Sequence, residues 1–316
     1  MYLRSSGFPL LIALALSGGG PALSAGAPPA VTPFKFAWPV PSRVGITERV
    51  VSERETVTLK YDAVLTARKA GTGFELHFEN LQQVEPDGRK DTADTKALVA
   101  TFTKPTLVLS ATGALTGLDE VDPALGRAVT VLEPAPEARE SLRSRWDTPL
   151  FQTLLRDRAE DTWNAWVQTW SGVALAPGQE RTQTVRIRHP NGPLEQRSTL
   201  HHRGAVAGTP GAVRLEWETA LDGASYRQVI ARSRELRCNT ALVRNPSDPC
   251  AAEVLESASN MTTVELVTEP DTLRPRSVRT ERTEAFTVKG QPPVLRRETR
   301  TFDFEWPRKA KRTTPR

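Results

Sequence analysis

Apolar and polar residues alternate along most of this chain, and the alternation restricts the fold more than any other feature. Val57, Leu59 and Tyr61 are apolar, while Thr58 and Lys60 between them are polar. Successive side chains of a strand point to opposite faces, so this pattern predicts a strand with one buried face. The same criterion, with turn residues between the runs, predicts strands at 57–65, 74–78, 106–110, 114–118, 183–189, 198–203, 212–218, 226–236, 262–268, 276–288 and 295–306.

A helical segment interrupts the strands. Residues 122–172 have apolar residues at spacings of three and four, in two pieces that are separated by prolines near 134. Thr148 is the predicted N-cap of the second helix, Pro149 suits its first position, and Gly172 suits its end. This helix presents a broad apolar face.

Strands, a helical segment and more strands, with short connections, predict a mainly β (α+β) fold. We expect a curved antiparallel sheet or half-open barrel packed on the central helical segment. The expected single domain covers 41–307, with the helical insert at 122–172. An Ala/Pro-rich linker at 26–40 is expected to precede it.

One strand-turn-strand run, LVLSATGALTG at 107–117, resembles a recurrent feature of uncharacterised secreted bacterial proteins. Together with the order of elements, it is similar to the half-open β-barrel over helices of periplasmic lipoprotein-carrier proteins. The resemblance implies a fold only and assigns no functional residue.

The N-terminus has the pattern of a secretory signal peptide. Arg4 is followed by a short apolar block at 8–16 and then by small residues, with cleavage predicted after Ala25 or Ala27. A membrane-spanning helix needs about 20 apolar residues, roughly twice the length of this block. We therefore expect residues 1–25 to be removed and the product to be periplasmic or extracellular, and not membrane-spanning.

The basic character of the chain lies at its ends. The net charge is +5, but Arg4 and residues 308–316 hold six of the 42 positive charges, which leaves 36 against 37 negative ones. A neutral body does not predict a nucleic-acid partner. The segment 308–316 is expected to be a basic disordered tail.

The chain has two cysteines, Cys238 and Cys250. In an oxidising compartment a disulfide between them is the default expectation, and closing this short loop is worth roughly 3 kcal/mol in the loop-entropy model. A metal pair or a catalytic thiol is the alternative, but no histidine or acidic cluster is spaced with them.

Candidate chemistry is sparse. His201 and His202 are neighbours on a predicted strand and should point to opposite faces, so they cannot share one metal. His77 lies between Glu75 and Glu79 on a face predicted to be in solvent. We found no recognised catalytic motif, and we expect no catalytic residue, metal or cofactor.

Four tryptophans in the helical segment carry the sharpest hypothesis. Trp146, Trp163, Trp166 and Trp170 either fill the core or line a cavity for an apolar or lipid-like ligand. The expected function is that of a secreted, non-enzymatic binding or structural protein of the bacterial envelope. The alternative is an interaction module for another envelope protein or a cell-wall polymer, and an enzyme without a recognisable motif comes third.

Overall fold

The computed structural model describes residues 31–53, 56–69, 71–84, 101–132, 148–189, 191–244 and 254–307. The predicted signal peptide and its cleavage sites, residues 26–30 of the predicted linker, and the basic segment 308–316 lie outside these residues.

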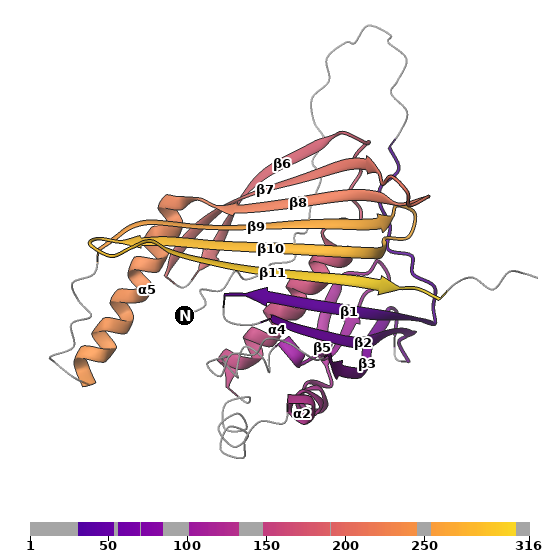
Figure 1. Cartoon of the computed structure of the whole chain (residues 1–316), viewed down its shortest axis with the longest axis horizontal. Coiled ribbons are helices and arrows are strands. Elements are labelled where there is room, and N and C mark those ends of the chain that lie inside the picture. Colours follow the sequence, from indigo (N-terminus) through magenta and orange to yellow (C-terminus); the bar gives the residue numbers. More distant parts are fainter. Residues whose placement is uncertain are drawn as a thin grey trace, which may run out of the picture.

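These residues form a mainly β fold with one antiparallel sheet of 11 strands that does not close. The order across the sheet is β5-β4-β3-β2-β1-β11-β10-β9-β8-β7-β6, so the first and last strands are neighbours at its centre (Figure 1). The strands are β1 (Ser42–Ser52), β2 (Thr56–Ala67), β3 (Phe74–Gln83), β4 (Thr106–Leu109), β5 (Leu115–Asp119), β6 (Glu180–His189), β7 (Gly192–Ala205), β8 (Val213–Leu221), β9 (Leu255–Glu269), β10 (Arg274–Val288) and β11 (Val294–Glu305).

The helices are α2 (Val121–Leu132), α4 (Pro149–Trp163), the π-helical turn η1 (Asn164–Gln168) that continues α4, and α5 (Gly223–Arg244). Figure 1 shows α4 and α2 in the half of the molecule that holds β1 to β5, whereas α5 lies at one end of the longer strands. Helix α5 contacts β9 and β7.

Two apolar clusters result from this arrangement. The large one joins the inner face of the sheet to α2, α4 and η1, and it includes Trp163, Trp166 and Trp170. The small one packs α5 against the sheet through Tyr226 and Val229, among others. The region around α4 therefore holds most of the buried aromatic side chains.

The start of α4 follows the predicted capping chemistry. The hydroxyl of Thr148 accepts a hydrogen bond from the Phe151 amide at 3.3 Å, and Pro149 occupies the first turn. Gly172 lies beyond η1 with φ of 83°, a backbone conformation that glycine adopts without strain.

Replacing Thr148 with Ala should lower the free energy of unfolding by about 1 kcal/mol, because the first turn of α4 loses a side-chain acceptor. Urea denaturation of the purified protein measures this difference. Thr148→Ser keeps the hydroxyl and should lose much less, so an equal loss in both variants would contradict a capping role.

The prediction of a strand at 226–236 is wrong. This stretch belongs to α5, where Tyr226, Val229, Ile230 and Ser233 are buried. Their spacing of three, one and three residues places them on one helical face. The carboxylate of Asp222 accepts from the Ser225 amide at 2.8 Å and caps the helix.

The segment predicted as a linker also contributes to the core. Phe34 and Trp38 are each 4% exposed, and backbone hydrogen bonds join Phe34 to Gly172 and Val173. The indole of Trp38 donates to the carbonyl of Leu273 at 3.0 Å. The packed part of the chain therefore begins before residue 41.

Candidate ligand-binding site

A buried carboxylate lies at the centre of the sheet. Glu48 of β1 is 0% exposed, because it occupies the inward phase of its strand between Ile46 and Val50. Burying a charge is costly unless the charge is paired and hydrogen-bonded. The surroundings of Glu48 supply those partners.

Three side chains donate to Glu48. The amino group of Lys104 lies 2.7 Å and the hydroxyl of Tyr61 3.0 Å from Oε2, and Nη2 of Arg300 lies 2.7 Å from Oε1. Tyr61 belongs to β2, Lys104 to the segment before β4 and Arg300 to β11. Burial acts to raise the pKa of Glu48, but Lys104 and Arg300 outweigh it and lower the pKa to about 2.

A second ion pair joins α4 to β11, the strand that carries Arg300. Arg158 binds the carboxylate of Glu298 with two hydrogen bonds, at 2.7 Å and 3.3 Å. Burial acts to raise the pKa of Glu298, yet its arginine neighbours, Arg158 foremost, lower it to about 2. Nη2 of Arg300 also reaches the hydroxyl of Thr162 at 3.4 Å, so α4 and β11 meet through polar groups here.

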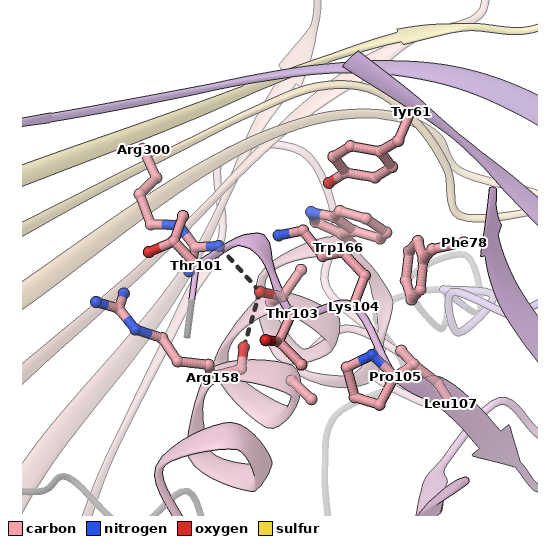
Figure 2. Close-up of a pocket in the computed structure, with 12 residues that line it drawn as sticks. Tyr61, Phe78, Thr101, Thr103, Lys104, Pro105, Leu107, Arg158, Trp166 and Arg300 are labelled. Atoms are coloured by element: carbon pink, nitrogen blue, oxygen red, sulfur yellow. Dashed lines mark hydrogen bonds between the residues drawn. The ribbon is translucent and has the colours of Figure 1, made fainter. Parts of the chain in front are cut away.

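A small cavity lies beside these charges, between the sheet and α4. Tyr61, Phe78, Leu107 and Trp166 form its apolar wall. Its charged wall consists of Lys104, Arg158 and Arg300. Figure 2 shows Arg300 and Arg158 on one side and Phe78 and Leu107 on the opposite side, with Trp166 between them.

The cavity measures about 30 Å³, which is room for roughly two water molecules. Two buried N–H groups of its lining side chains, Nε of Arg300 and Nε1 of Trp166, have no hydrogen-bond partner. A buried donor without a partner costs roughly 1–3 kcal/mol. A ligand or a water molecule beside these two groups would supply the missing acceptor.

Of the four tryptophans that the sequence suggested as cavity residues, Trp166 lines the cavity, and Trp163 and Trp170 do not. Trp163, Trp166 and Trp170 are all 0% exposed, and the rings of Trp163 and Trp166 are 6.5 Å apart. Trp163 donates to the carbonyl of Gly113 at 2.7 Å. Trp146 lies outside the described residues, as do Cys250 and the side chain of Cys238, so the predicted disulfide stays a prediction.

The histidines do not gather into a site. His202 is buried and donates to the carbonyl of Leu175 at 2.8 Å, while His201 lies 3.1 Å from Glu180 on the other face. This confirms the prediction that the two rings face opposite sides. In the described ranges, no group of three or more His, Cys, Asp or Glu side chains could hold a metal ion.

His77 lies on the face of β3 opposite the buried Leu76 and Phe78, as predicted, but its ring is only partly in solvent. Its side chain is 29% exposed and therefore half-buried, where a solvent-facing ring was expected. The reason is that Thr106 and Glu120 pack beside it, with Nδ1 lying 3.2 Å from the Thr106 hydroxyl and 3.7 Å from the Glu120 carboxylate.

Sequence reasoning missed Glu48, Lys104 and Arg300. Two of them did leave a signal. Glu48 stands in the apolar phase of β1, and Arg300 stands in the phase of Phe302 and Phe304 in β11. A charged residue in the buried phase of a strand indicates a paired interior charge.

Compared with models of known protein families and with curated proteins, the chain shows no match. In the part of the chain that the structure describes, no helix combines the length and the apolar character needed to cross a membrane.

Proposed function

We propose that this chain is a non-enzymatic binding protein of the bacterial envelope, and that it holds an amphiphilic ligand in the cavity between the sheet and α4. The observation that carries the proposal is the cavity itself, where aromatic side chains face buried cations and two N–H donors lack partners. Ligand sites are mostly apolar with a few polar groups that fix orientation.

The helical segment has a defined place in this proposal. We infer that α4 and η1 form the centre of a half-open barrel. The sheet does not close, and its open side would leave the interior accessible. The inference is supported by the ring of Trp166, which lies 5.3 Å from Phe302 and 5.0 Å from Phe304 of β11. The secretory pattern of the first 25 residues supports a location outside the cytoplasm.

The small volume sets a requirement for binding. The cavity admits only a few ligand atoms, so the apolar remainder of a ligand needs space that side chains now fill. We expect Phe78 and Leu107 to move apart from Trp166 when the ligand enters. The apolar part of the ligand would then replace the contacts between these side chains, and the interior would remain apolar.

Native mass spectrometry of protein purified without detergent tests the proposal. We expect a co-purifying mass, or a one-to-one complex after addition of dodecanoate. Ala159 also lines the cavity, so Ala159→Phe should fill it and abolish the complex. Ala231→Phe, at an exposed position of α5, is the matched control and should bind normally. A bare mass under all conditions would contradict the proposal.

An interaction module is the second candidate. It is favoured by β6, which ends the sheet and pairs only with β7 among the described strands. An edge strand presents unpaired backbone groups to another chain. Crosslinking in intact cells, with a photoreactive residue at Thr184, would capture a partner if this candidate holds.

A further inference from the structure

We propose that the cavity beside Trp166 recognises a carboxylate, so that the ligand is an ionised fatty acid or a similar amphiphilic carboxylate. This inference rests on the proposed function. It follows from the kind of hydrogen-bonding groups at the cavity, from their charge and from the space between them.

The unsatisfied groups at the cavity are donors. Nε of Arg300 and Nε1 of Trp166 are both N–H groups, and neither can accept a hydrogen bond. The ammonium of Lys104 has three N–H donors, one of which binds Glu48 at 2.7 Å. A ligand that satisfies these groups must bring acceptors, and a carboxylate brings only acceptors.

The charge favours an anion. Among the described side chains of the cluster, Lys104, Arg158 and Arg300 face two carboxylates, Glu48 and Glu298. One further negative charge would neutralise this set. Asp161 of α4 and Arg282 of β10 lie close enough to this set to interact with it, and counting both leaves the same excess of one positive charge.

The space favours a carboxylate over a phosphate. A volume of about 30 Å³ suits two oxygen atoms, whereas a phosphate group carries four oxygens in a tetrahedron. Nη2 of Arg300 already binds Glu48 and Thr162, so its unused Nε offers one further hydrogen bond. One oxygen on Arg300 and one on Trp166 would use both unpaired donors.

The apolar part of the ligand would extend toward the wall of the cavity opposite the charged side chains. Figure 2 places Phe78, Pro105 and Leu107 across the cavity from Arg300 and Arg158. A carboxylate held at the charged wall would therefore direct its hydrocarbon chain past Trp166 toward these residues. The cavity orients an amphiphile with its charge inward.

Isothermal titration calorimetry with ligands of one chain length tests the inference. At mildly alkaline pH, dodecanoate should bind at least about tenfold more tightly than dodecanol, dodecyl phosphate or dodecyltrimethylammonium, because hydrogen bonds to a charged acceptor are stronger than those to a neutral one. Equal affinity for dodecanol would overturn the carboxylate inference but leave the proposed function standing. Tighter binding of dodecyl phosphate would overturn the choice of carboxylate. Failure of every ligand would overturn both proposals, with water as the natural occupant.

Two variants separate the donors from the apolar wall. Trp166→Phe removes Nε1 and keeps an aromatic ring, and Arg300→Lys keeps the charge and removes Nε. Each should weaken dodecanoate binding about tenfold and leave dodecanol binding unchanged. Trp217→Phe is the control, because its indole donates to Ser198 at 2.8 Å and its ring does not line the cavity.

The outcomes of these variants remain decisive if one of them fails to fold. Arg300 also binds Glu48, so Arg300→Lys carries the greater risk. Trp166→Phe alone then decides, with circular dichroism as the check on folding. Unchanged dodecanoate affinity in folded Trp166→Phe would overturn the assignment of Nε1 to the carboxylate.

Discussion

Replacing Glu48 with Gln should lower the free energy of unfolding by about 3–5 kcal/mol near neutral pH. Lys104 and Arg300 donate to this carboxylate at 2.7 Å each, and both would be left buried without it. Urea denaturation measures the loss. Glu265→Gln removes an exposed ion pair with Arg214 and should change stability by less than about 1 kcal/mol.

The pH dependence of stability provides a second readout of Glu48. Its pKa is about 2 in the folded protein, against an ordinary value of 4.5. The stabilisation is therefore fully present above about pH 4.5 and is lost as the pH falls toward 2. Glu48→Gln should flatten this part of the profile, leaving the contribution of Glu298. An unchanged acid limb would contradict the central role of Glu48.

Replacing Trp166 with Ala should cost about 3–5 kcal/mol of folding stability. The indole is 0% exposed and lies within 5.3 Å of the ring of Phe302 and 5.0 Å of that of Phe304. Its removal would leave a void between η1 and β11 that the surrounding side chains do not fill. Thermal and urea denaturation both measure the loss.

Leu295→Ala is the control for the tryptophan variant. Leu295 is 53% exposed on β11, so its truncation should change stability by no more than about 0.5 kcal/mol. A Trp166→Ala variant as stable as this control would mean that η1 does not pack on the sheet. Far-ultraviolet circular dichroism should show that both variants keep the strands.

Most strands could be predicted because one face of each is buried and the other is not. In β11, Phe302 and Phe304 alternate with Thr301 and Asp303, and this phase determines which side faces the core. The error at α5 arose because short runs of apolar residues fit both the two-residue period of a strand and the 3.6-residue period of a helix. Only the spacing of Tyr226, Val229, Ile230 and Ser233 distinguishes the helix.

The tryptophan-bearing helix could be predicted, but its charged neighbours could not. The local pattern predicts that Trp166 faces the interior, since it belongs to one helical face. Arg300 and Glu48 are separated by 252 residues along the chain, and nothing local to either indicates the other. Their pairing depends on which strands are neighbours, and the alternation of a strand does not contain that information.

The placement of β1 next to β11 has a consequence for how the chain folds. Gly45 pairs with Glu305, so the middle of the sheet joins segments from opposite ends of the polypeptide. Among the described strands, β1 to β5 and β6 to β11 each pair within their own half, and the two halves of the sheet pair with each other only at this seam. Contacts so distant in sequence slow folding. A chain synthesised from its N-terminus would therefore complete its sheet only after its final strand has left the ribosome.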